Sequence, residues 1–321
     1  MRYADPTALA PVAVYTYSRY EHLVQTLEAL RRNHLAQQTV LYVVSDGAKE
    51  GSHEPVVRQI RDYVDQLSGF REVVRVYRDT NLGLRRSIPD AEKMILGDHG
   101  RIINMEDDNI TSPNYLDFMN TGLQHFENDP AVYSICGYCP PVAASVDADA
   151  GDFWRYPWNA SWGYGVWKSK HDRFHPLRNR YEDFCANGSL RRQNKAGGLY
   201  VSDSLKRDHQ GQKYFPDAIL CTDMFLAGMQ AILPTVSKVR NTGQDGSGQS
   251  TQQKTDKYEV ALDVGAQRGF DFEHESRLAQ AYRIGARRLF NGGLTTQLAR
   301  SLGVYHQLAE WKAQWALRSV R

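Results

Sequence analysis

The sequence predicts an α/β fold in which a mostly parallel sheet is flanked by helices. Short runs rich in Val, Ile and Tyr alternate with amphipathic runs of helical periodicity between residues 11 and 138. Polar clusters follow four of these apolar runs, as expected at the ligand-binding edge of a parallel sheet. A chain of 321 residues is long enough for one large α/β domain or two smaller ones.

In chain order, the apolar runs predict strands at residues 12–16, 40–44, 73–76, 101–105 and 132–135. Helical periodicity predicts helices at residues 19–30, 56–67, 87–96 and 113–126. We expect the first helix to begin with a capping box formed by Ser18 and Glu21. Strands separated by helices need crossover connections, so the sheet should be mostly parallel.

The pattern changes after residue 150. Four tryptophans and two glycines crowd one stretch, which suggests either an aromatic platform for a flat ligand such as a sugar or an aromatic wall of the core: Trp154, Trp158, Trp162, Gly163, Gly165 and Trp167. Residues 179–213 are polar and are expected to be rich in loops. A helix is expected to begin near Thr222 and Asp223, followed by a strand at 231–233. Residues 243–249 have the composition of a lid or a linker.

The C-terminal residues 277–321 are predicted to be helical and are strongly basic. Eight Arg or Lys residues stand against Glu310 alone, and Trp311 and Trp315 share a helical face. This pattern is compatible with peripheral contact to anionic lipid or a lipid-linked substrate. The alternative is a packing helix with a solvated basic face.

Composition excludes several classes of protein. A formal net charge of +2 gives no electrostatic sign of nucleic-acid binding. Neither a signal-peptide pattern nor an apolar run of about 20 residues is present, so we expect a cytoplasmic protein. Four cysteines provide no disulfide framework, and Pro140-Pro141 after Cys139 argues against a redox helix at Cys136 and Cys139. Glycine motifs of dinucleotide-binding and P-loop proteins are missing.

Three adjacent acids, Glu106, Asp107 and Asp108, end the strand predicted at 101–105. Adjacent carboxylates repel one another and remain ionised together most readily beside a cation, and oxygen ligands suit Mg²⁺ or Mn²⁺. The alternative is an exposed acidic loop. Similar polar clusters follow the other strands, at residues 16–19, 45–47 and 81–83, and the four clusters should converge on one edge of the sheet.

These segments resemble the inverting nucleotide-sugar glycosyltransferases of the GT-A fold, the group that includes N-acetylglucosaminyltransferase I and bacterial relatives. The matching motifs are Ser18-Arg19, Ser45-Asp46-Gly47, residues 81–87, Glu106-Asp107-Asp108 with Ser112-Pro113, residues 135–138 and 161–167, Thr222-Asp223-Met224-Phe225 and Ile232-Leu233-Pro234. The resemblance implies a GT-A (Rossmann-like) catalytic domain over residues 1–254, with a nucleotide-binding half at 1–138 and an acceptor half at 139–254. A helical extension would occupy 255–321.

The resemblance also implies roles for individual residues. Asp108 would bind Mn²⁺ or Mg²⁺, and Asp223 would be the general base, kept ionised by its position at a helix start. The nucleotide of the donor would contact Thr16, Ser18, Arg19, Asp46, Arg85, Arg86, Glu106 and Asp107, with Asp46 on the N–H of a uracil ring. Trp162, Gly163 and Tyr164 would form a platform for the sugar or the acceptor. One departure is Ser250, where bacterial relatives often carry His.

The expected activity is metal-dependent, inverting transfer of a sugar from a nucleoside diphosphate, expected to be UDP, to a hydroxyl of a glycan or glycolipid, in bacterial surface polysaccharide synthesis. Two alternatives remain open. A sugar-phosphate nucleotidyltransferase would usually carry a glycine-rich loop after the first strand, which is absent here. A non-catalytic nucleotide-sugar-binding protein is suggested only by the changed residue at position 250.

Overall fold

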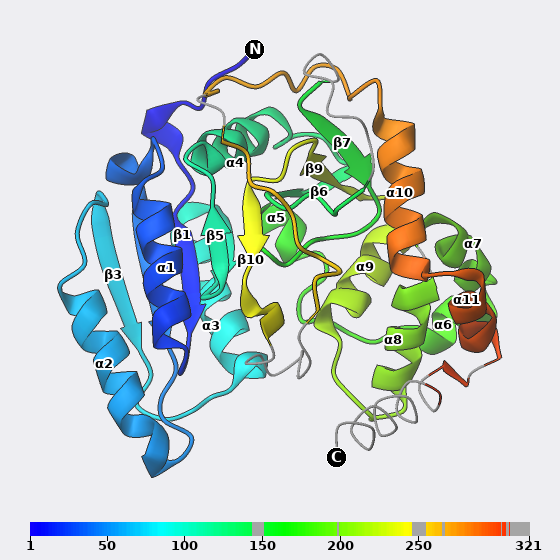
Figure 1. Cartoon of the computed structure of the whole chain (residues 1–321), viewed down its shortest axis with the longest axis horizontal. Helices are drawn as coiled ribbons and strands as arrows, with labels where there is room; N and C mark the ends of the chain where they lie inside the picture. The colour runs from blue at the N-terminus through cyan, green and yellow to red at the C-terminus, as the bar shows by residue number, and fades with distance from the viewer. Residues whose placement is uncertain are drawn as a thin grey trace.

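The computed structural model describes residues 1–142, 151–197, 199–245, 255–264 and 267–302, together with 304, 305 and 308. A mixed sheet of eight strands lies at its centre, in the order β3-β2-β1-β4-β8-β6-β9-β7 (Figure 1). These strands are β1 (Val12–Thr16), β2 (Val40–Ser45), β3 (Glu72–Tyr77), β4 (Arg101–Glu106), β6 (Val132–Cys136), β7 (Phe153–Tyr156), β8 (Tyr164–Trp167) and β9 (Gln230–Pro234). A small antiparallel pair joins β5 (Asn109–Thr111) to β10 (Val239–Asn241).

The first half of the sheet is parallel, as the sequence predicts. β1 pairs in parallel with both β2 and β4, and β2 pairs in parallel with β3. The register sets Thr16 opposite Ser45 and Tyr15 opposite Glu106, so the carboxyl ends of the three central strands lie at one edge. That edge is where the polar clusters were expected to meet, and the α/β fold class is confirmed.

The second half of the sheet differs from a simple parallel arrangement. β8 lies antiparallel between β4 and β6, and β7 forms an antiparallel edge strand beside β9. Neither strand was predicted, because its aromatic residues were interpreted as a platform. Trp154 in β7 and Trp167 at the end of β8 are almost completely buried. For these two tryptophans the alternative of an aromatic core wall is therefore correct.

Helices cover both faces of the sheet. One face packs on α1 (Tyr20–Arg31), α2 (Glu54–Asp65) and α4 (Tyr115–His125), through residues such as Leu27, Ile60 and Leu116. The other face packs on α3 (Leu84–His99), α9 (Pro216–Leu226) and α10 (Ala279–Asn291), through Ile95, Met224 and others. Side chains alternate along β1, with Val12 and Val14 in the first layer and Ala13 in the second.

Two local predictions about helix starts are wrong. α1 begins at Tyr20, with Arg19 at the N-cap and no side-chain cap, so Ser18 and Glu21 do not form a capping box. α9 begins at Pro216, not near Asp223. Pro at the first helical position needs no N–H partner and has its φ set for a helix. Pro216 carries that signal in the sequence.

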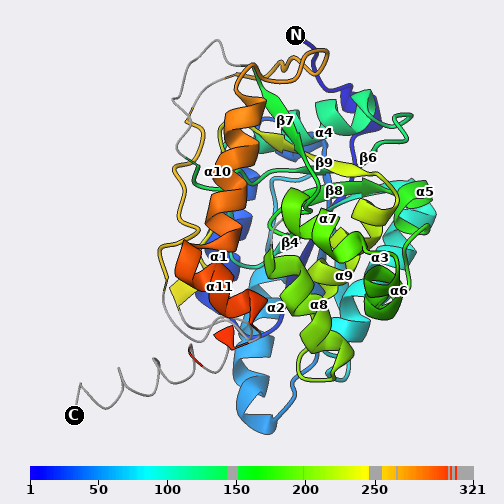
Figure 2. The ribbon, with the colours of Figure 1, turned by 90° about the vertical axis from the view of Figure 1, so that its right-hand side faces the viewer.

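The polar region 179–213 is helical, contrary to expectation. It contains α6 (Tyr181–Ala186), α7 (Ser189–Ala196) and α8 (Leu199–His209), which follow the short α5 (Lys168–His171). Arg, Gln, Lys and Leu are good helix formers, so a polar stretch can form an exposed helix. Figure 2 shows α6 and α8 beside one another, below the sheet in that view.

The described residues after 254 are only partly helical. Residues 255–264 and 267–278 contain no helix, although Phe270 and Phe272 are buried in the same core as α4. Helices follow at α10, which runs along β7 (Figures 1 and 2), and at α11 (Leu294–Ser301).

Residues 309–321, with Trp311 and Trp315, lie outside the described residues, so the membrane contact stays a prediction. The domain boundary at 254 also lies outside them. Within the described part of the chain, no helix combines the length and apolarity that a membrane span needs.

Candidate functional site

Arg19 joins the end of β1 to the acidic residues after β4. Its guanidinium contacts a carboxylate oxygen of Asp107 and lies 2.7 Å from Oδ2 of Asp108. Thr16, the last residue of β1, donates a hydrogen bond of 3.1 Å from its hydroxyl to Oδ2 of Asp107. The structure therefore brings together four of the predicted site residues. Ser18 precedes Arg19 in the same turn and is half-buried.

The carboxylate of Asp108 is held from three sides. Asn109 and Asn241 donate side-chain hydrogen bonds of 2.8 and 2.6 Å to its Oδ1, while Arg19 lies at Oδ2. Gly243 follows β10 and approaches so closely that a Cβ there would lie 2.0 Å from Oδ2. The segment after β10 thus packs directly on the acidic residues. The altered position 250 lies beyond it, outside the described residues.

Asp46 organises the neighbouring loop. Its Oδ1 accepts hydrogen bonds from the backbone N–H groups of Gly47 (3.1 Å) and Leu82 (2.9 Å), and its Oδ2 accepts one from Gly83 (2.8 Å). Gly83 is the N-cap of α3. Asp46 therefore fixes the entry to the helix that carries Arg85 and Arg86, and contact with a base stays a prediction for it.

Arg85 and Arg86 project from the exposed first turn of α3. The guanidinium carbon of Arg85 lies 4.1 Å from the ring centre of Tyr214, a cation–π contact. Tyr214 in turn is close enough to Asp217 for the two groups to interact electrostatically. This chain of contacts places the start of α3 beside the start of α9.

Asp217 is a site residue that the sequence analysis missed. It lies in the first turn of α9, is exposed, and accepts a hydrogen bond of 2.6 Å from Ser161. Its negative charge also raises the pKa of Glu106. Desolvation by the surrounding protein raises the pKa of Asp217, and the hydrogen bond from Ser161 opposes the rise. A first-turn acid after proline was the available signal.

More negative than positive groups act on the carboxyl group of Glu106. Burial raises its pKa well above the usual value, and the charges of Asp108, Asp217 and Asp107 raise it further, while Arg19 acts in the opposite direction. Burial also raises the pKa of Asp107, against the lowering effect of Arg19. Three carboxyl groups and only one guanidinium act on Glu106, so a further positive charge would favour its ionised form.

This surplus of negative charge fits a divalent cation. The oxygens of Glu106, Asp107 and Asp108 do not converge as a set of three within 4.8 Å. The protein would therefore supply one or two carboxylate ligands, and the remaining ligands would come from water and the phosphates of a substrate. Magnesium-type sites commonly have this composition.

Asp223 lies elsewhere on α9 than expected. It occupies the second half of the helix, is 7% exposed and so lacks the stabilisation of a helix start. Burial raises its pKa to about 6, and Arg180 opposes the rise. The negative charge of Asp223 contributes to raising the pKa of buried Tyr133. The expectation that a helix start keeps Asp223 ionised is therefore wrong, and its role as general base stays a prediction.

The predicted platform is mostly turned inward. Gly163 is buried with φ +71°, and a Cβ there would meet the hydroxyl of Tyr115 at 2.9 Å. Tyr164 donates a hydrogen bond of 3.0 Å to Glu92. Trp162 is half-buried, packs edge-on against Tyr138, and follows Ser161, the partner of Asp217. Of the three residues, Trp162 is the one that directly follows the hydrogen-bond partner of Asp217.

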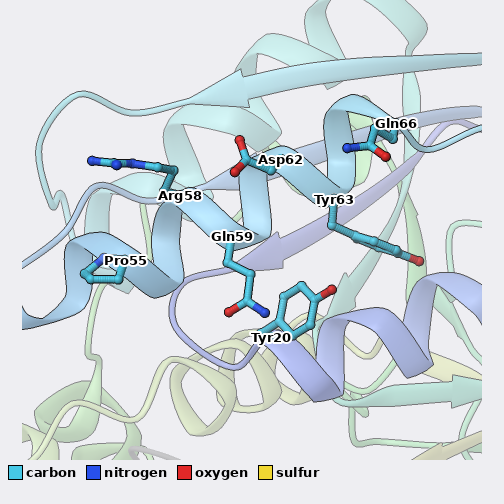
Figure 3. A pocket seen from close by; sticks show the side chains of 7 residues that line it. All are labelled: Tyr20, Pro55, Arg58, Gln59, Asp62, Tyr63 and Gln66. Carbon is cyan, nitrogen blue, oxygen red and sulfur yellow. The ribbon is translucent and has the colours of Figure 1, made fainter.

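Two other features take no part in this site. Burial raises the pKa of the Cys136 and Cys139 thiols to about 12, so both are protonated and unreactive at neutral pH. A surface depression of about 420 Å³ lies between α1 and α2 and contains none of the predicted site residues (Figure 3). Its lining is Tyr20, Pro55, Arg58, Gln59, Asp62, Tyr63 and Gln66.

Comparison with known proteins gives structural similarity only. No family model matches the chain. No curated protein matches it either. Among solved structures, it is similar to the mannosyltransferase PcManGT from Pyrobaculum calidifontis in complex with GDP-Man and Mn²⁺, with 13% identity and a TM-score of 0.44 over 99% of this chain and 83% of that one.

Two further solved structures are similar at the same level. S. aureus TarS 1-349 shares 9% identity over 74% of this chain and 61% of that one, with a TM-score of 0.43. GalNAc-T7 with UDP, GalNAc and Mn²⁺ shares 8% identity over 72% of this chain and 43% of that one, with a TM-score of 0.45. Such likeness concerns the arrangement of strands and helices, and the function proposed below rests on the site itself.

Proposed function

We propose that this protein is a divalent-metal-dependent, inverting glycosyltransferase that uses a nucleoside diphosphate sugar, with uridine as the base. The acceptor would be a hydroxyl of a glycan or glycolipid, as in bacterial surface polysaccharide synthesis. The proposal rests on one observation: Arg19 contacts both Asp107 and Asp108 at the sheet edge. The carboxyl groups of Glu106 and Asp217 lie beside these three residues. These are the groups needed to hold a diphosphate and to accept a proton.

The donor would lie along the carboxyl ends of β1, β2 and β4. Asp108 and Glu106 would hold Mn²⁺ or Mg²⁺, which when bound neutralises negative charge on the departing nucleoside diphosphate. Arg19 and Arg85 supply guanidinium groups, whose planar N–H donors match phosphate oxygens. Asp46 supports this side indirectly, because it fixes the loop that leads to Arg85.

Asp217 is the better-placed proton acceptor. Ser161 donates its hydrogen bond to Oδ1, so Oδ2 would take the proton. The helix dipole of α9 favours the charged form of a first-turn carboxylate. Asp223, the residue suggested by the sequence resemblance, is 7% exposed and lies in the second half of α9, so we place it second.

The reaction would proceed in one displacement. The acceptor oxygen forms a bond to the anomeric carbon while the bond from that carbon to the β-phosphate oxygen breaks. The acceptor's proton passes to Asp217, and the bonding pair leaves with the nucleoside diphosphate. Attack from the face opposite the leaving group inverts the anomeric centre, so no carboxylate nucleophile is needed.

The assignment is tested with water as acceptor, because the natural acceptor is unidentified. Slow hydrolysis of UDP-sugars is measured for the wild type, Asp217→Asn and Asp223→Asn. We expect Asp217→Asn to lose at least about 100-fold in kcat while still binding donor, since general-base catalysis contributes roughly 10²–10⁴-fold. Normal turnover in Asp217→Asn with loss in Asp223→Asn would return the role to Asp223.

A non-catalytic nucleotide-sugar-binding protein is the second candidate. The observation in its favour is that Arg19 already pairs with both Asp107 and Asp108, which reduces the need for a metal ion. Hydrolysis of no donor, together with donor binding that is indifferent to chelator, would support it. Release of pyrophosphate from UTP and a sugar phosphate would instead indicate a nucleotidyltransferase.

A further inference from the structure

A second group of possible metal ligands lies away from the acidic triplet. Glu92 of α3, His171 of α5 and His175 in the following turn each offer a ligand atom, and these atoms lie within 4.8 Å of one another. Glu92 and His171 are almost completely buried, and His175 is half-buried. Buried ionisable groups are paired or bind metals, because an isolated buried charge is costly.

Hydrogen bonds hold both imidazole rings through their Nδ1 atoms. Nδ1 of His175 lies 3.1 Å from the backbone oxygen of His171, and Nδ1 of His171 lies 3.3 Å from Oδ1 of Asp172. In a neutral ring, an acceptor at Nδ1 holds the proton there and leaves the lone pair on Nε2. Without an ion, Nε2 of His171 also lies 3.4 Å from the carboxylate of Glu92, a contact that a bound metal would replace. Metal-bound histidines usually have this second contact to a carbonyl or carboxylate.

The carboxylate of Glu92 is anchored in the same way. Its Oε1 accepts hydrogen bonds from Nδ2 of Asn104 (2.9 Å) and the hydroxyl of Tyr164 (3.0 Å). Its Oε2 is therefore the atom left for another partner, and it faces Nε2 of His171 at 3.4 Å. Two ligands about 2.0–2.1 Å from a tetrahedral zinc ion lie roughly 3.3 Å apart. An N–H···O hydrogen bond is shorter, at 2.7–3.2 Å.

We propose that Glu92, His171 and His175 form a zinc site that ties α3 to the end of β8, separate from the cation of the donor site. Two imidazoles and one carboxylate suit Zn²⁺, whereas Mg²⁺ and Mn²⁺ favour oxygen ligands. Water would complete the tetrahedron. The two rings stack with centres 3.7 Å apart and planes 8° apart, so they must rotate out of this stack for both Nε2 atoms to face one ion.

The location suggests that the ion would stabilise the wall behind the donor site. Asn104 lies on β4, two residues before Glu106, and Tyr164 begins β8. Both side chains bind the carboxylate that would ligate the ion. The zinc site does not depend on the proposed activity, because its ligands, binding and stabilising effect can be measured without a donor or an acceptor.

The test is zinc binding by the full chain after removal of metals with a chelator. Zinc content, competition with a chromophoric chelator and the visible spectrum of the Co²⁺ form are measured for the wild type and His175→Gln, with His171→Gln as the second variant. His274→Gln, at an exposed histidine outside the group, is the matched control. Asp108→Asn separates this site from the acidic residues that would hold the donor's cation.

We expect one zinc per wild-type chain, a tetrahedral Co²⁺ spectrum, and a rise in Tm of about 4 °C at a hundred times the Kd. His175→Gln should weaken zinc binding at least tenfold, while His274→Gln and Asp108→Asn should retain it. Equal zinc uptake by the wild type and His175→Gln would overturn the proposal. So would loss of zinc in Asp108→Asn, or no uptake at all, which would leave Glu92 and His171 as an ordinary ion pair.

Discussion

The guanidinium of Arg19 lies 2.7 Å from Oδ2 of Asp108 and also contacts Asp107. Its positive charge thus partly balances the two carboxylates, as a divalent cation would otherwise do. Arg19 is about a quarter exposed and Asp107 is nearly buried. Arg19→Gln should destabilise the protein by about 1–3 kcal/mol, because it leaves two carboxylates without their partner, and partial exposure reduces the effect below that of a fully buried pair. Urea unfolding measures the change.

Added Mn²⁺ should restore part of the stability of Arg19→Gln and raise its Tm more than that of the wild type. Arg2→Gln is the matched control, because Arg2 pairs with Glu273 at the surface and both are at least half exposed. We expect a change of no more than about 0.5–1 kcal/mol there. An equal Mn²⁺ response in Arg19→Gln and the wild type would count against a cation at these carboxylates.

Donor binding should depend on a metal and on Asp108. A UDP-sugar with Mn²⁺ at a hundred times its Kd should add about 2.7 kcal/mol of stability, which is about 4 °C in Tm for a chain of this length. Chelation or Asp108→Ala should remove most of the shift. Asp90→Ala, at an exposed acid on α3, should leave it intact. Equal shifts with every nucleotide, with or without chelator, would contradict metal-assisted donor binding.

The raised pKa of Asp223 should be visible in the pH dependence of stability. Burial raises the folded-state pKa from 3.8 to about 6, so between these values the folded state binds more protons than the unfolded state. Stability from this residue is therefore present at low pH and is lost as pH rises from about 4 through 6, by roughly 2–3 kcal/mol.

Asp223→Asn removes the titrating group and should abolish that component. Unfolding free energies of the wild type and Asp223→Asn are compared at pH 4, 5, 6 and 7.5. We expect the variant to gain stability relative to the wild type as the pH rises. A difference that stays constant across this range would show that Asp223 does not titrate near pH 6.

Gly243 should tolerate no side chain beside the acidic residues. A Cβ there would lie 2.0 Å from Oδ2 of Asp108 and 3.0 Å from the Nη1 of Arg19. Gly243→Ala should therefore displace one of these groups, cost about 1–3 kcal/mol and weaken donor binding. Gly97→Ala, at an exposed position of α3 with open space around it, should stabilise the protein by about 0.5–1 kcal/mol. Unchanged donor affinity in Gly243→Ala would argue against this close packing.

The sequence by itself determined the parallel half of the sheet and the residues at its ligand-binding edge. Strands β1, β2 and β4 follow local periodicity, and parallel pairing necessarily places Thr16, Arg19 and the acidic triplet together. Only the tertiary structure decided that β8 inserts antiparallel beside β4 and that the charge of Asp217 acts on Glu106. Those arrangements depend on how distant segments pack, and local residue patterns carry little information about such contacts.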